Sequence, residues 1–123
     1  MQIPAELLYS SDHEWVARSG NTIRMGITDY AQDALGDVVY VDLPKAGSTI
    51  AAGAIVGEAE STKSVGELFA PVSGEIIEAN QAVIDSPELV NSDPYGAGWL
   101  FSVNVTSLGS LISADEYEDL ITE

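Results

Sequence analysis

Short β-type segments separated by turn residues fill the chain from Ser48 to Val105, and this pattern restricts the possible folds more than any other feature. Apolar and polar residues alternate within each segment, as they do in strands that bury one face. Glycine, proline, asparagine and aspartate interrupt the pattern, most densely in QAVIDSPELVNSDPYGAGW, which we predict to be mostly loop. Because such short strands are stable only when they pair and pack, the sequence predicts a mainly β sandwich or barrel.

Two further strands and a short helix are predicted ahead of this region. Residues 14–27 alternate around a Ser19-Gly20-Asn21 turn, which is typical of a β-hairpin. Thr28 is a suitable N-cap residue, and Gly36 is suitable for the position that follows a helix. We therefore expect a helix of about two turns between them.

One more strand and a terminal helix complete the expected elements. The segment VVYVDLP, residues 38–44, predicts a strand whose even-numbered residues face one way and whose odd-numbered residues face the other. Its proline ends the strand. Near the end of the chain, Ser113 and Glu116 form a capping box, which predicts a helix over about residues 113–122.

A weak internal symmetry surrounds Lys63. Gly53 and Gly74 lie at nearly equal distances on either side of this lysine, and a β-rich segment follows each of them. The arrangement predicts two similar strand–turn–strand halves, with the glycines at the corners where a small sheet bends.

Charge and composition exclude several classes of protein. The net charge is −16, from 20 acidic and four basic residues, and such a field repels phosphate backbones, so we expect no nucleic-acid partner. It favours partners that carry basic patches, although acidity can also serve solubility or a salty habitat. Cysteine is absent, which excludes disulfides. With no membrane-length apolar run and no signal-peptide pattern, we expect a cytoplasmic protein that has no membrane partner.

The residues offer no convincing catalytic constellation or metal site. The only histidine, His13, is far from any serine in a nucleophile-elbow pattern. The Asp12–Glu14 triplet is poorly arranged for a metal, because neighbouring strand residues point to opposite faces. We interpret His13 as a packed or hydrogen-bonded structural residue. Four aromatic side chains are expected in the core rather than on a ligand: Trp15, Phe69, Trp99 and Phe101.

Lys63 is one of only two lysines and has small hydroxyl neighbours, Thr62 and Ser64. A lysine at such a turn can be an ordinary surface residue, and Lys45, in the LPKAG turn, is its natural comparison. A protruding amine on a flexible stem also suits the attachment of a carrier group, because acylation removes its charge and the stem adds reach. The residues around Lys63 leave both interpretations open.

Five ordered motifs resemble those of one known family. They are SSDHEWV, GITDYAQDALGDVVYVDLP, ESTKSVGELFAPVSGE, LVNSDPYGAGWL and SADEY, and together they span nearly the whole chain. The chain resembles the H proteins of the glycine cleavage system, a family of lipoyl carriers. The resemblance implies a single domain over residues 1–123, with a lipoyl/biotinyl-type β-sandwich (a barrel-sandwich hybrid) and short flanking helices. It places the lipoyl hairpin core at about residues 37–105.

The resemblance also implies a cofactor and a set of partners. Lys63 would carry lipoic acid in amide linkage, attached by a lipoate ligase or a lipoyl/octanoyl transferase. Glycine decarboxylase would transfer the aminomethyl remnant of glycine to the arm, and aminomethyltransferase would pass the carbon to tetrahydrofolate. Dihydrolipoyl dehydrogenase would reoxidise the dithiol. The chain itself would be a non-catalytic carrier.

The family is also known for holding its loaded arm in a surface recess, and the matching positions here are Asp12, Glu14 and Glu67. The loaded arm carries a cationic amine that is vulnerable to water, so an acidic and partly dry recess would hold and protect it. The family usually has serine at position 12 and often aspartate at position 67, so the detailed hydrogen bonds are expected to differ.

Other functions compete with this interpretation. An H-like protein could donate lipoyl groups to other acceptors, and a biotin carrier could share the fold. Biotin carriers place their lysine between two methionines, unlike the neighbours of Lys63. An unmodified acidic interaction module that kept only the fold is an alternative from a different class.

Overall fold

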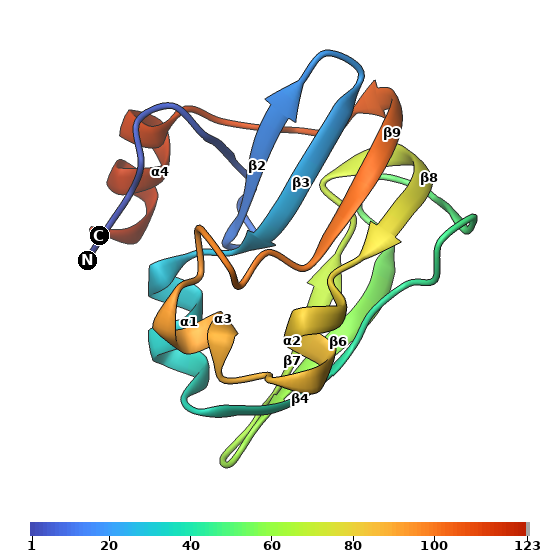
Figure 1. Cartoon of the computed structure of the whole chain (residues 1–123). Helices are drawn as coiled ribbons and strands as arrows, with labels where there is room; N and C mark the ends of the chain where they lie inside the picture. Colours follow the sequence, from blue (N-terminus) through green and yellow to red (C-terminus); the bar gives the residue numbers. More distant parts are fainter. Residues whose placement is uncertain (123) are drawn as a thin grey trace.

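Antiparallel strands form two sheets in a computed structural model that describes residues 1–122 (Figure 1). In pairing order, the six-stranded sheet contains β1 (Leu8–Tyr9), β2 (Glu14–Ser19), β3 (Thr22–Ile27), β9 (Phe101–Leu108), β8 (Val72–Ala79) and β5 (Thr49–Ile50). The three-stranded sheet contains β4 (Val38–Asp42), β6 (Ile55–Ser61) and β7 (Val65–Phe69). The predicted hairpin over residues 14–27 is confirmed as β2 and β3.

The main core lies between the two sheets, because each sheet turns an apolar face toward the other. Buried side chains come from both, including Val16, Met25, Ile76 and Val103 of the six-stranded sheet and Val41, Ala59 and Leu68 of the three-stranded sheet. The mainly β sandwich with short flanking helices that the sequence predicts is therefore confirmed.

The chain passes from one sheet to the other on both sides of Lys63, which agrees with the predicted symmetry. It crosses between β5 and β6 at Gly53, whose φ of 88° is in the left-handed region that favours glycine. It crosses back between β7 and β8, where Ala70 accepts a hydrogen bond from the Gly53 N–H (2.8 Å) and donates one to the Ala54 carbonyl (2.8 Å). Gly74 lies just beyond, where the β8–β9 register shifts. The β6–β7 hairpin between the two crossings extends beyond the sandwich (Figure 1).

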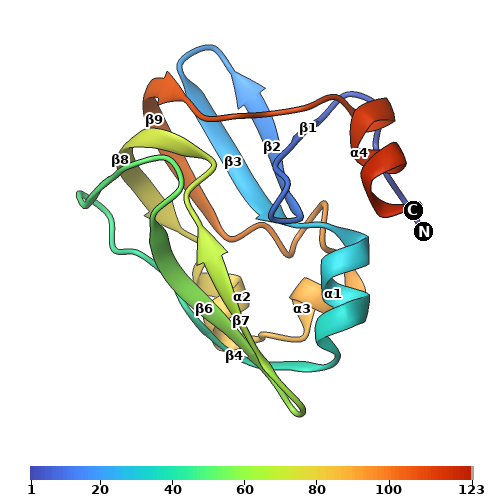
Figure 2. The ribbon, with the colours of Figure 1, turned by 180° about the vertical axis from the view of Figure 1, so that it is seen from behind.

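Four short helices flank the sheets in the described part of the chain: α1 (Asp29–Leu35), α2 (Gln81–Asp85), α3 (Leu89–Ser92) and α4 (Ala114–Ile121). The helices α1 and α4 are confirmed with their predicted caps, Thr28 and the Ser113–Glu116 capping box. The first three helices lie at the end of the molecule from which the hairpin extends, whereas α4 packs beside β1 and β2 (Figures 1 and 2). Within residues 1–122 no helix is long and apolar enough to cross a membrane.

The prediction that QAVIDSPELVNSDPYGAGW is mostly loop is wrong over residues 81–92, which contain α2 and α3. The turn-forming residues in this segment also cap helices. Asn80 caps α2 by accepting a hydrogen bond from the Ala82 N–H (3.1 Å). Val83 and Val90 are fully buried, so packing against the sandwich stabilises helices that are too short to form alone.

The predicted alternation of β4 is also wrong. Val38 and Val41 are both buried, although the alternation places them on opposite faces. Val39 and Tyr40 are both exposed. The register with β6 shifts between Val38 and Tyr40, which indicates a bulge. One extra residue in a strand reverses the direction of every later side chain, and sequence alternation does not reveal where it is inserted.

A second apolar cluster attaches α4 to the first strands. Tyr117 of α4 stacks on Tyr9 of β1 with ring centroids 4.8 Å apart, and Trp15 of β2 completes the buried part of the cluster. Trp15 and Phe101 are buried as predicted, but Phe69 and Trp99 are only half-buried. The guanidinium of Arg24 stacks over the ring of Trp99, and its carbon lies 4.3 Å from the ring centroid.

Candidate functional site

Lys63 lies at the exposed tip of the β6–β7 hairpin, where the sequence places it. Ser61 fixes the shape of this tip. Its buried hydroxyl oxygen accepts hydrogen bonds from the backbone N–H groups of Lys63 (3.2 Å) and Ser64 (3.0 Å) and donates to the Ser64 carbonyl (3.1 Å). Serine is a common turn residue because its hydroxyl can satisfy nearby backbone groups in this way. The lysine therefore projects from a rigid turn.

The end of α1 supports the tip from behind. The Thr62 N–H donates to the Asp37 carbonyl (3.1 Å), which joins the hairpin to the residue that follows Gly36. Gly36 has a φ of 90°, and a Cβ placed on it would lie 3.0 Å from Lys63 Cε. The stem of Lys63 thus lies directly against the Gly36 backbone, and a Cβ at this position would press on the stem.

Asn91 of α3 holds this supporting segment in place. Its Oδ1 accepts a hydrogen bond from the Val38 N–H (2.8 Å). Its Nδ2 donates to Gln32 Oε1 (3.0 Å) and to the Gly36 carbonyl (2.9 Å). One side chain from a helix that the sequence did not predict therefore fixes the end of α1 and the start of β4.

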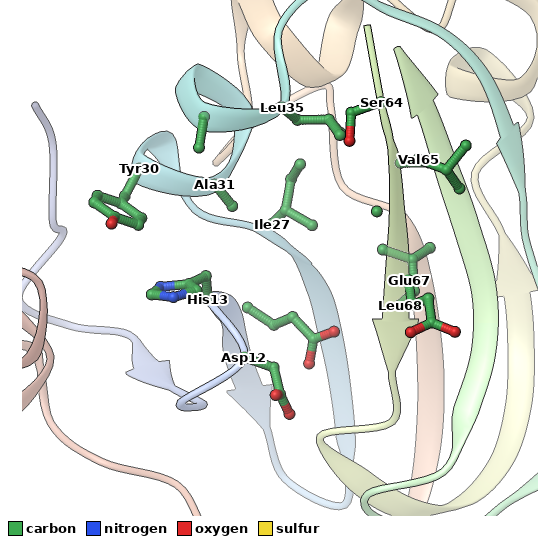
Figure 3. A pocket seen from close by; sticks show the side chains of 14 residues that line it. Asp12, His13, Ile27, Tyr30, Ala31, Leu35, Ser64, Val65, Glu67 and Leu68 are labelled. Atoms are coloured by element: carbon green, nitrogen blue, oxygen red, sulfur yellow. The ribbon is translucent and has the colours of Figure 1, made fainter.

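A recess of about 290 Å³ opens beside the tip, between α1, the edge strand β7 and the loop that precedes β2 (Figure 3). Leu35 and Ser64, the residue that follows Lys63, border one end of it. His13 and Asp12 border the other end (Figure 3). Apolar side chains form most of the remaining wall, namely Ile27, Ala31, Ala34, Val65 and Leu68. A flexible chain attached to Lys63 could therefore follow an apolar path toward a polar end.

The three carboxyl residues expected at this recess all line it. Asp12 and Glu67 are exposed and approach it from opposite sides (Figure 3). Glu14 is different, because only 1% of its surface is exposed. Its Oε2 accepts the Phe69 N–H (2.7 Å), and its Oε1 accepts the Ser10 hydroxyl (3.2 Å).

Burial raises the pKa of Glu14 to about 8, since the charged form loses its hydration, and the Phe69 N–H only partly offsets this effect. At pH 7 Glu14 is mainly a neutral carboxylic acid. The recess therefore combines one buried neutral acid with two exposed carboxylates, rather than three equivalent anions.

His13 has an unusual backbone and a fixed ring. Its φ of 66° makes it the one non-glycine residue with positive φ in the described chain. Its Nδ1 lies 2.9 Å from the Tyr117 hydroxyl, and its ring packs at 4.8 Å from that of Tyr30. Burial lowers the pKa of His13, although nearby Asp12 opposes the shift. The interpretation of His13 as a hydrogen-bonded structural residue is confirmed.

Sequence reasoning predicted the lysine and the three carboxyl residues but missed the residues that position them. Ser61 had a usable signal, because a serine two residues before a turn lysine can bond to the turn backbone. Asn91 and Tyr117 had none. Asn91 bonds to Val38, 53 residues away, and Tyr117 bonds to His13, 104 residues away. No local sequence pattern indicates contacts over such separations.

Comparisons with known proteins agree with this geometry. The model of the family described as "Glycine cleavage H-protein" matches residues 7–123. The glycine cleavage system H protein of Mycolicibacterium smegmatis is 53% identical over 129 residues, which cover 99% of this chain and 98% of the relative. That of Clavibacter sepedonicus is 56% identical over 117 residues, which cover 95% of each chain.

A solved structure gives the same result. The crystal structure of a glycine cleavage system H protein from Mycobacterium marinum superposes with a TM-score of 0.93, at 46% identity over 98% of this chain and 99% of that one. The resemblance carried by the five sequence motifs is thereby confirmed over almost the full length. The chain belongs to the glycine cleavage H-protein family.

Proposed function

We propose that Lys63 carries lipoic acid in amide linkage and that the recess shelters the loaded arm between encounters with its enzymes. The lipoyl carrier role in the glycine cleavage system follows from the family to which the chain belongs. The observation that carries the assignment to Lys63 is its place at the rigid hairpin tip, directly before Ser64 at the end of the recess. Lys45 is exposed too, but it lies in the connection between β4 and β5, outside the residues that line the recess.

When attached, lipoic acid supplies a disulfide that accepts the aminomethyl group of glycine and is restored by oxidation of the dithiol. The proposed partners are glycine decarboxylase, aminomethyltransferase and dihydrolipoyl dehydrogenase, together with a lipoate ligase or a lipoyl/octanoyl transferase for attachment. The exposed tip leaves Lys63 accessible to each of them in turn. This chain presents the lipoyl arm to the enzymes and protects its load, and it catalyses no step itself. The cytoplasmic location stays a prediction.

The recess fits an arm of this kind on two grounds. Its apolar wall, which includes Ala31, Leu35 and Leu68, can remove a methylene chain from water. Its carboxyl groups can receive a cationic amine at the far end of the chain. A cation close to Glu14 favours the ionised carboxylate, so the pKa of Glu14 falls from about 8 and the side chain releases a proton as the amine arrives. Loading thereby shifts Glu14 from its neutral form toward its charged form.

The recess is tested by the lifetime of the loaded arm. In the lipoylated protein, loaded from glycine by the decarboxylase, a Glu14→Gln, Glu67→Gln double variant should lose its load to hydrolysis several-fold faster than the wild type. A Glu75→Gln, Glu78→Gln variant makes the same two side-chain replacements at exposed positions of β8, away from the recess, and should behave as the wild type. Equal lifetimes in all three proteins would remove the proposed role of the recess.

A further inference from the structure

The hydroxyl of Tyr117 joins two segments that border the recess, although Tyr117 itself belongs to the C-terminal helix. The side chain is completely buried. Its oxygen lies 2.9 Å from His13 Nδ1 and 2.8 Å from Thr28 Oγ1. His13 borders the recess directly, and Thr28 is the N-cap of α1, which forms one of its walls. A single hydroxyl therefore contacts both segments.

The two segments are also bonded to each other beneath this hydroxyl. The Thr28 N–H donates to the His13 carbonyl (3.1 Å), and Thr28 Oγ1 accepts the N–H of Ala31 (3.2 Å), a residue of the recess wall. His13 holds a left-handed backbone conformation that a residue with a side chain seldom adopts, so surrounding contacts must maintain it. Tyr117 supplies one of these contacts from outside the recess.

Packing alone does not require a tyrosine at this position. The ring of Tyr117 stacks on Tyr9 with an interplanar angle of 9°, and a phenylalanine ring would fill the same space. A buried hydroxyl is costly unless it is hydrogen-bonded, so its two partners are what make it favourable here. Because His13 lines the recess and Thr28 caps the helix that forms one of its walls, the hydroxyl acts on recess geometry.

We propose that Tyr117 is a positioning residue for the recess, through which the C-terminal helix holds His13 and the first turn of α1 in the arrangement that shelters the loaded arm. The inference rests on the proposed function and extends it to a helix that contributes no side chain to the recess wall. When α4 is docked, the recess is formed. When the hydroxyl is missing, His13 and the α1 cap are joined by the Thr28–His13 backbone bond alone, the His13 ring loses its partner, and water reaches the arm more often.

The test compares Tyr117→Phe with Tyr9→Phe. The two tyrosines are stacked on each other and equally buried, but the Tyr9 hydroxyl donates to the Pro4 carbonyl (2.6 Å), away from the recess. In the lipoylated and loaded proteins, Tyr117→Phe should lose its load about three- to tenfold faster, the change expected when a net hydrogen bond is lost. Tyr9→Phe should match the wild type. Equal lifetimes for the two variants would overturn the proposal.

A second measurement needs no lipoyl group. His13 is the only histidine of the chain, so its imidazole gives a single set of NMR signals and a single titration curve. Tyr117→Phe should shift these ring signals and the titration midpoint, whereas Tyr9→Phe should not. An unchanged titration curve in Tyr117→Phe would contradict the positioning role even if Lys63 were unmodified. Lipoylated Lys63 with unchanged load lifetimes would defeat this inference and leave the carrier function standing.

Two further variants distinguish the loss of the Tyr117 contacts from a general folding defect. His13→Asn removes the imidazole while keeping a residue that tolerates the left-handed backbone, and it should shorten the load lifetime as Tyr117→Phe does. Thr28→Ser keeps the hydroxyl that caps α1 and contacts Tyr117, so it should preserve the wild-type lifetime. A normal lifetime in His13→Asn, or a shortened one in Thr28→Ser, would count against the proposal.

Discussion

The buried carboxyl group of Glu14 accepts a hydrogen bond of 2.7 Å from the backbone N–H of Phe69. Glu14 begins β2 of the six-stranded sheet, and Phe69 ends β7, the edge of the three-stranded sheet. The contact therefore connects the two sheets at the side of the recess. It also satisfies an N–H on an unpaired strand edge, and it is made by a carboxyl group whose pKa is raised by its burial.

Glu14 should make the folded protein less stable as the pH rises. The pKa of Glu14 is about 8 in the folded state and 4.5 in the reference state, so between these values the folded chain holds a proton that the unfolded chain has lost. Its contribution to the free energy of unfolding is therefore complete below about pH 4.5 and is lost as the pH approaches 8. Urea unfolding of wild type and Glu14→Gln at pH 5 and pH 8 measures it.

The glutamine variant is the proper control because it keeps an oxygen for the Phe69 N–H and cannot ionise. Between pH 5 and pH 8 the wild type should lose roughly 2–4 kcal/mol more of its free energy of unfolding than Glu14→Gln loses. The other carboxyl groups of this acidic chain affect both proteins alike. Parallel pH profiles for the two proteins would show that Glu14 is not buried as a neutral acid.

Replacement of Ser61 by alanine should loosen the lysine tip. The change removes three hydrogen bonds, to the Lys63 and Ser64 N–H groups and to the Ser64 carbonyl, and should lower the free energy of unfolding by about 1–3 kcal/mol. We expect a larger KM for lipoate attachment with the unmodified variant as substrate. Ser73→Ala also removes a bond from a backbone N–H, that of Ala52, but away from the tip, and its KM should stay normal.

A comparison of two glycine variants separates the effect of contact with the Lys63 side chain from the effect of backbone strain. Gly36 and Gly47 have φ values of 90° and 89°, so Gly36→Ala and Gly47→Ala should each cost about 1–3 kcal/mol in strain. A new Cβ would meet Lys63 only at Gly36, since the space around Gly47 is open to 4 Å. Lipoate attachment should therefore slow for Gly36→Ala alone, and equal rates in the two variants would contradict the contact.

Asn91→Asp should destabilise the support of the tip. The carboxylate of the variant can still accept a hydrogen bond from the Val38 N–H. Its second oxygen replaces the Asn91 Nδ2 group that donates to Gln32 Oε1 and to the Gly36 carbonyl, so oxygen faces oxygen at both contacts. We expect a loss of about 2–4 kcal/mol in the free energy of unfolding, measured with urea, because two acceptors lose their donor and a charge is brought among them. The neighbouring exposed change Ser92→Asp adds the same charge and should cost much less.

Much of the fold follows from local sequence signals. The β2–β3 hairpin, the caps of α1 and α4 and the position of Lys63 at a turn depend on residues within a few positions of one another, so they could be predicted. The bulge in β4 and the short helices α2 and α3 could not, because neighbours far along the chain stabilise them. Val83 and Val90 become helical by burial against the sandwich, not by propensity.

The candidate site divides in the same way. The family resemblance placed Lys63, Asp12, Glu14 and Glu67, but the motif does not reveal that Glu14 is buried and neutral. That property depends on how deeply the two sheets enclose the side chain, which is a result of packing. The tie from Tyr117 to His13 spans 104 residues and likewise becomes visible only in three dimensions.

The central claim is that Lys63 is the lipoyl attachment site. It is tested most directly by mass spectrometry of the intact protein and of its proteolytic peptides, after expression in cells supplied with lipoate. The account predicts a lipoyl-sized mass increase that maps to the peptide containing Lys63 and disappears in Lys63→Arg but persists in Lys45→Arg. Protein that stays unmodified under these conditions, or that carries the increase on Lys45, would contradict it.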